Sequence, residues 1–128
     1  MIYVDSSALV KLVVEEAESG SLRDLLATDA DLLASAIIEA EVVRAVRRVA
    51  PELTEKAVEV VAQVNVIEVS DTIRARAALL EPVTLRSLGA LHLATAVEIG
   101  DALDAVVTYD ARMASASTSL GLVVHAPT

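Results

Sequence analysis

The chain has 128 residues, with 19 acidic side chains against 10 Lys and Arg and a formal net charge of -9 at pH 7. It has no Cys, Phe or Trp and only two Tyr, which excludes disulfides, thiolate zinc sites, cysteine nucleophiles and a platform of aromatic rings for stacking bases. Any phosphate-bearing ligand of so acidic a protein must be met by a local arginine cluster or by bound cations. Hydrophobic residues make up 55% of the chain, so we expect one core and a single domain over residues 1–128.

Short apolar segments alternate with amphipathic ones along the chain. In chain order we predict a strand at 2–4, helices at 8–17 and 22–27, a strand at 32–34, helices at 35–50 and 54–64, a strand at 66–69, helices at 71–80 and 88–99, a strand at 105–109, a helix from 110, and a strand at 122–124. Ser35 is the expected N-cap of the 35–50 helix, which Pro51 stops.

The predicted strands are apolar throughout, without the alternation of a half-exposed sheet. Such strands are covered on both faces, so we expect an α/β fold with a mainly parallel central sheet between layers of helices. In open parallel sheets, ligands bind beyond the carboxyl ends of the strands. Asp5 and Asp110 each stand where a strand passes into a helix, so both carboxylates are expected in the same crevice.

No apolar run approaches the roughly 20 residues of a membrane helix. The first apolar stretch is interrupted by Asp5 and Lys11 and has no positively charged leader. We therefore expect a cytoplasmic protein that does not bind membranes.

The helix predicted at 35–50 carries two glutamates and a group of arginines. At about 100° per residue, Glu41 falls at the border of the apolar arc and Glu39 nominally inside it. Periodicity alone does not decide which glutamate is functional. Arg44 lies on the opposite side of the helix, where a solvated face is the ordinary explanation.

A site made of carboxylates from separate elements, without cysteine, favours binding of Mg²⁺ or Mn²⁺ over zinc. A bound divalent ion polarises a phosphoryl oxygen and activates water, which is metal-assisted phosphodiester hydrolysis. The alternative is structural: Asp5 and Asp110 are also suitable N-caps, and Glu41 is correctly spaced to pair with Arg44.

Four motifs in order resemble the PIN domain of the VapC toxin family: IYVDSSALVKL from Ile2, EVVRAVRR from Glu41, LRSLGALHLATA from Leu85 and VTYDARM from Val107. The resemblance covers essentially the whole chain. It implies a three-layer α/β/α sandwich, Mg²⁺- or Mn²⁺-dependent RNA cleavage, a toxin role, homodimerisation and inhibition by a VapB-type antitoxin.

The family's acidic residues map onto Asp5, Glu41 and Asp110, which we expect to hold the metal and support catalysis. In this resemblance Glu41, not Glu39, is the functional glutamate. Ser7 and Thr108 are expected in supporting roles, holding a carboxylate or a metal-bound water.

Two arginines, Arg44 and Arg112, are candidates for contact with a phosphate or with the antitoxin. We also expect the acid cluster to attract an antitoxin arginine, which would compete with the metal.

One position departs from the family pattern: Gly89 stands where the motif before HLATA usually has Asp. Three carboxylates still suffice for one Mg²⁺, but a second ion loses a ligand. The competing hypothesis is a weakened or silent module that serves mainly to bind its antitoxin. His92 is a poor substitute ligand, because imidazole suits softer metals. A phosphoacceptor role for Asp5 is a more remote alternative, since position 7 is Ser.

Overall fold

A computed structural model describes residues 1–28 and 31–128. Within them, five parallel strands form one sheet in the order β3-β2-β1-β4-β5. The strands are β1 (Ile2–Val4), β2 (Leu32–Ser35), β3 (Asn65–Ile67), β4 (Ala105–Val107) and β5 (Val124–His125).

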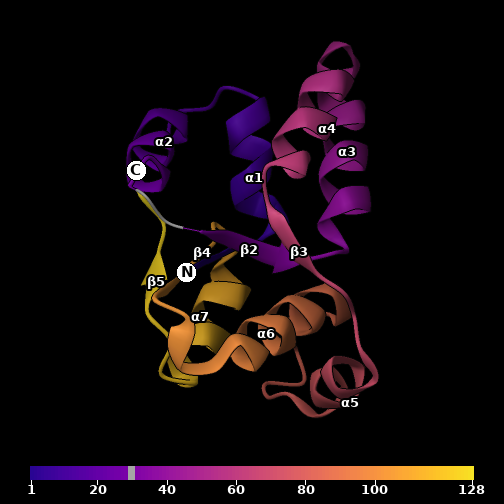
Figure 1. The fold of residues 1–128 in the computed structure, drawn as a ribbon, viewed down its shortest axis with the longest axis vertical. Coiled ribbons are helices and arrows are strands. Elements are labelled where there is room, and N and C mark those ends of the chain that lie inside the picture. Colours follow the sequence, from indigo (N-terminus) through magenta and orange to yellow (C-terminus); the bar gives the residue numbers. More distant parts are fainter. Residues whose placement is uncertain (29–30) are drawn as a thin grey trace.

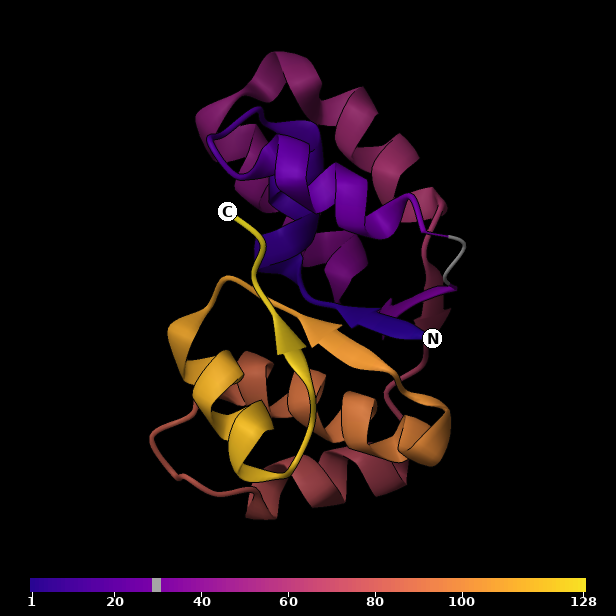
Figure 2. The ribbon, with the colours of Figure 1, turned by 90° about the vertical axis from the view of Figure 1, so that its left-hand side faces the viewer.

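Helices cover both faces of this sheet (Figures 1 and 2). One layer contains α1 (Ser6–Val13), α2 (Ser19–Leu26), α3 (Ile38–Val49) and α4 (Thr54–Ala62). The other contains α5 (Asp71–Leu79), α6 (Ser87–Ile99) and α7 (Ala111–Ser119). Short 3-10 turns occupy Pro51–Leu53 and Gly100–Ala102. The predicted α/β/α sandwich with a parallel central sheet is confirmed.

Alternation along β1 divides the core into two clusters. Ile2 and Val4 pack among the aliphatic side chains of the α1–α4 layer, while Tyr3, fully buried, joins Leu93 and Met113 on the other face. A strand buried on both faces reads as an apolar run without alternation, as the sequence indicated. Tyr3 is consequently the one ring that reaches from β1 into the α6 layer among the described residues.

The start of α1 and the start of α3 differ from prediction. α1 begins at Ser6 because the Asp5 side chain accepts the N–H of Ala8 as an N-cap, and the chain turns extended at Val14. Ser35 does not cap the next helix. It is the last residue of β2, and α3 begins at Ile38.

Other boundaries shift by one to three residues. α2 begins at Ser19, where the hydroxyl donates to the carbonyl of Lys11 and closes the turn. The strands predicted at 66–69 and 105–109 are shorter, as β3 and β4, and the last strand lies at 124–125 instead of 122–124. Hydrophobic periodicity places the ends of an element only to within a few residues, which accounts for shifts of this size.

The chain order of the sheet reverses beside β1. From β1 the chain runs outward through β2 to β3, then returns to β4 on the other side of β1. Val4 is aligned with Val107, so the residues that follow, Asp5 and Thr108, leave adjacent strands at the same edge. This is the switch point at which open parallel sheets bind ligands.

In the part of the chain that the structure describes, no helix combines the length and apolar character required to cross a bilayer.

Candidate active site

Asp5 lies at the switch point and is only 5% exposed. Its Oδ1 accepts hydrogen bonds from the Ser7 hydroxyl at 2.6 Å and the Ala8 N–H at 3.2 Å, and its Oδ2 accepts one from the Thr108 hydroxyl. Asp5 is therefore both the N-cap of α1 and the centre of a polar cluster. The N-cap role that the sequence allows for Asp5 is thus present in the structure.

Burial raises the pKa of Asp5 above its ordinary value, although the hydrogen bonds from Ser7 and Thr108 act in the opposite direction. Among the described residues no Lys or Arg forms an ion pair with Asp5. Ionised Asp5 is thus an incompletely compensated charge, which a bound cation would neutralise.

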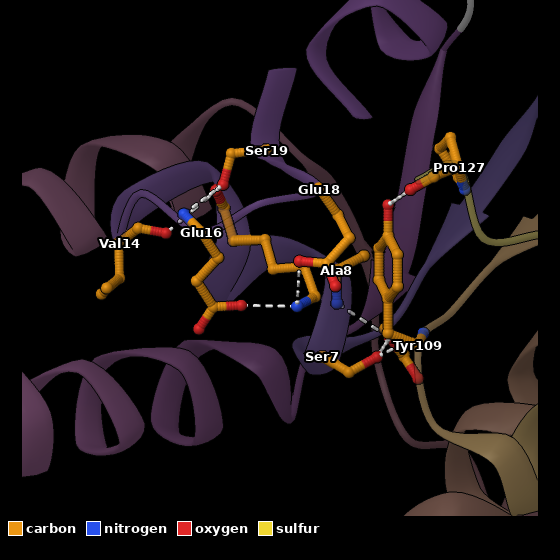
Figure 3. A network of polar contacts seen from close by, with 10 residues as sticks. Ser7, Ala8, Val14, Glu16, Glu18, Ser19, Tyr109 and Pro127 are labelled. Atoms are coloured by element: carbon orange, nitrogen blue, oxygen red, sulfur yellow. Dashed lines mark hydrogen bonds and ion pairs between the residues drawn. The ribbon is translucent and has the colours of Figure 1, made fainter. Parts of the chain in front are cut away.

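Ser7 and Thr108 connect Asp5 to the loop after β4. The Tyr109 N–H donates to Ser7 Oγ at 2.9 Å, and the Asp110 N–H donates to Thr108 Oγ1 at 3.1 Å. The Tyr109 hydroxyl in turn donates to the carbonyl of Pro127 (Figure 3). Both hydroxyls therefore hold the Asp5 carboxylate and the β4 loop together.

Glu41 and Glu39 occupy different surroundings. Glu41 Oε1 lies 2.7 Å from Nε2 of His92, and Oε2 lies 3.4 Å from the Ser6 hydroxyl, next to Asp5. Glu39 is exposed and lines a separate cavity between α3 and α4. Among the described residues, Glu41 forms its ion-pair contact with His92 and none with Arg44.

Sequence reasoning missed the buried partner of Glu41. His92, 3% exposed, uses its other nitrogen, Nδ1, for the Tyr3 hydroxyl at 2.5 Å, and that hydroxyl also accepts the Ser35 N–H at 3.1 Å. Both ring nitrogens are therefore engaged, which leaves none for a metal. The only sequence signal was two polar residues, Tyr3 and His92, inside otherwise apolar elements.

The Tyr3 hydroxyl is influenced by both Asp5 and Glu41. Burial raises the pKa of Tyr3 most strongly, and the negative charges of Asp5 and Glu41 both raise it further. The two carboxylates therefore act on one hydroxyl, although they come from the start of α1 and from α3.

The Asp110 carboxylate caps a helix. It is exposed and caps α7, where Oδ1 accepts the N–H groups of Arg112 at 2.8 Å and Met113 at 3.1 Å. Within residues 1–28 and 31–128, no group of three or more His, Cys, Asp or Glu side chains is close enough to hold a metal ion. The expected cage of three carboxylates is thus not assembled here.

A cavity of about 510 Å³ opens beside Glu41. Its lining combines polar, basic and apolar side chains, namely Ser6, Ile37, Ala40, Glu41, Arg44, Ala45, Arg48 and Leu88. Arg44 and Arg48 are exposed and therefore able to meet an anion that enters the cavity. Arg112 is exposed near Asp110 and does not line this cavity.

Gly89 lies in the first turn of α6, one turn before His92. A Cβ built there would meet only the side chain of Leu85, with Cδ1 at 3.0 Å. Among the described residues no other side chain lies within 4 Å of this Cβ position.

Comparison with known proteins agrees with this fold. Residues 2–118 match the family model of the PIN domain, so the chain belongs to the PIN domain family. Ribonuclease VapC35 of Mycobacterium tuberculosis is 44% identical over 131 residues, covering 99% of this chain and 97% of that protein. The chain is thus a VapC-type PIN domain, and the predicted resemblance is confirmed.

Solved structures share the architecture. M. tuberculosis VapC20, described as a Sarcin-Ricin loop cleaving toxin, superposes with a TM-score of 0.78 at 17% identity, covering 96% of this chain and 97% of that one. A toxin-antitoxin complex from Klebsiella pneumoniae gives 0.75 at 21% identity, covering 100% and 98%. At these identities the likeness establishes the fold.

Proposed function

We propose that this protein is a metal-dependent endoribonuclease toxin of a VapBC-type pair, which hydrolyses RNA phosphodiester bonds with water activated by Mg²⁺ or Mn²⁺. The observation that carries the proposal is the buried, incompletely compensated Asp5 at the switch point, with Glu41 in contact with the next residue, Ser6. The ribonuclease names of the relatives support the same reaction.

The donor chemistry of the site fits a hard divalent cation. Asp5, Glu41 and Asp110 offer carboxylate oxygens, and Mg²⁺ needs only one or two protein carboxylates together with water and substrate phosphate. Such an ion supplies charge stabilisation and a water of lowered pKa. The protein's own part is to orient Asp5 through Ser7 and Thr108.

Arg44 and Arg48 would hold the RNA backbone in the cavity beside Glu41. Their positive charges would offset the repulsion between an acidic protein and the phosphates of RNA. Further proposals are a VapB-type antitoxin as partner, in line with the toxin-antitoxin title of one structural neighbour, and a homodimer. Arg112 is kept as a second candidate contact for a phosphate or for the antitoxin.

The direct test is RNA cleavage with Mg²⁺, with Mn²⁺ and with a chelator, using Glu41→Gln. We expect chelation to abolish cleavage and Glu41→Gln to lower kcat by about 100-fold, since removing a metal ligand costs several kcal/mol of transition-state stabilisation. The matched control is Glu39→Gln on the same helix, which should retain wild-type activity because Glu39 faces another cavity. Equal activity of the two variants, or cleavage without divalent ions, would contradict the proposal.

Replacing Arg44 with Ala should weaken RNA binding without impairing the chemical step. We expect KM to rise and the slope of log affinity against log salt to fall in magnitude by about 0.7, the value for one phosphate contact on single-stranded nucleic acid. Arg47→Ala is the control, because Arg47 lies on the same helix outside the cavity. A fall in kcat alone would show that Arg44 is not a backbone contact.

A silent antitoxin-binding module is the second candidate function. Gly89 favours it, because the position leaves the α6 side of the site without a carboxylate. The Gly89→Asp variant described in the Discussion separates the two candidates.

A further inference from the structure

A buried hydrogen-bonded chain runs from the middle of the sheet to Glu41. It begins at the Ser35 N–H of β2, passes through the Tyr3 hydroxyl and the His92 ring, and ends at Glu41 Oε1. It joins β1, β2, α3 and α6, and so crosses from one helical layer to the other at the carboxyl edge of the sheet (Figure 1). Neither the sequence motifs nor the proposed metal chemistry assigns a function to Tyr3 or His92.

The donors and acceptors in this chain determine where the protons lie. An ionised Glu41 carboxylate can only accept hydrogen bonds, so Nε2 of His92 carries a proton and donates to Oε1 at 2.7 Å. In the neutral ring Nδ1 is then bare. It accepts the proton of the Tyr3 hydroxyl, 2.5 Å away, whose oxygen also accepts the Ser35 N–H.

We propose that His92, oriented by Tyr3, is a positioning residue that commits one oxygen of Glu41 to the imidazole and turns the other toward Ser6 and the cavity. Without this contact Glu41 is free to turn along α3 toward Arg44, three residues on. The burial of His92 and Tyr3 makes the orientation a property of the fold. The consequence for metal binding rests on the proposed function, whereas the orientation itself does not.

Two substitutions of His92 separate donation from space filling. His92→Gln keeps an N–H that can reach Glu41, while His92→Leu removes it at similar volume. We expect His92→Leu to weaken Mn²⁺ binding, measured by titration calorimetry, by about 10–100-fold, as loss of a residue that orients a ligand does. His92→Gln should recover most of the affinity, and kcat should follow the affinity while KM for RNA stays unchanged.

The control for general destabilisation is Leu93→Val, a core change on the same helix without contact to Glu41. It should lower Tm and leave the Mn²⁺ affinity unchanged. Wild-type affinity in His92→Leu, or equal losses in the Gln and Leu variants, would overturn the positioning role.

A second measurement needs neither metal nor stable variants. ¹⁵N NMR of the wild-type protein near neutral pH should show His92 protonated at Nε2 and bare at Nδ1, and Tyr3→Phe should shift this tautomer balance. The opposite tautomer would overturn the inference. If wild-type protein binds no Mn²⁺ while the Nε2–H tautomer is present, the proposed nuclease function fails and the orientation of Glu41 by His92 stands.

Discussion

Asp5→Asn should abolish RNA cleavage and, at the same time, make the metal-free protein more stable. We expect cleavage to fall by about 100-fold or more, because Asp5 is the proposed ligand at the switch point. Asn keeps an oxygen for the Ser7 and Ala8 donors but removes the buried charge. A gain of about 1 kcal/mol would raise Tm by roughly 2–8 °C in a domain of this size.

The stability difference should depend on pH in a defined direction. Burial raises the pKa of Asp5 in the folded state above its ordinary value of 3.8. Between pH 3.8 and the raised pKa, Asp5 therefore keeps its proton in the folded protein but has lost it in the unfolded chain. Wild-type stability therefore falls as pH rises from about 3.8 through the raised pKa, and the loss is complete above it. The Tm advantage of Asp5→Asn should be greatest near neutral pH and vanish in acid.

Thermal unfolding from acidic to neutral pH, with and without Mn²⁺, measures these effects. Asp101→Asn is the control, since it removes an exposed charge outside the cluster. Mn²⁺ should raise the Tm of wild type and of the control but not of Asp5→Asn, because only a bound ion stabilises the folded state. A lower Tm for Asp5→Asn at neutral pH would show that the ionised carboxylate is compensated after all.

Gly89→Asp should increase both Mn²⁺ affinity and RNA cleavage by about 10-fold or more. This is the effect expected when the added carboxylate makes one further interaction worth about 1.4 kcal/mol. The substituted side chain would stand one turn before His92, on the same side of α6. It requires only a small shift of the Leu85 side chain, whose Cδ1 is 3.0 Å from the new Cβ position. Calorimetry and steady-state cleavage measure the two quantities.

Gly89→Ala separates the carboxylate from the backbone effect. Ala makes the same contact with Leu85 and gains the helix propensity that Gly lacks, so its Tm should rise without a change in Mn²⁺ affinity. Activity that appears only in Gly89→Asp would identify the natural chain as a silent module. Equal affinities of the Asp and Ala variants would show that position 89 lies outside the metal site.

The sequence predicted the layers and the site edge better than the contacts within the site. Uniformly apolar strands followed by Asp5 and Asp110 sufficed to place both acids at the carboxyl edge, since strand ends of a parallel sheet share one edge. It left open whether Asp110 is a cap, and in the structure its Oδ1 accepts the Met113 N–H at the start of α7. Capping and coordination use the same residue type at the same kind of position.

The Tyr3–His92–Glu41 chain was outside the reach of sequence reasoning for a different reason. It joins side chains from three elements, with Tyr3 and His92 89 positions apart, and no periodicity encodes which polar atoms meet across a sheet. The helix from 35 to 50 likewise gave no choice between Glu39 and Glu41. Burial of the partner His92 distinguishes their surroundings in the structure.

The bond between Thr108 and Asp5 spans 103 positions of a 128-residue chain. Contacts of such sequence separation form late, because a long loop must close first. During translation, β1 and α1 leave the ribosome long before β4 exists to complete the pocket. Under the proposed function, the Asp5–Thr108 bond would be completed only when synthesis is almost finished, which would delay RNA cleavage by the nascent chain.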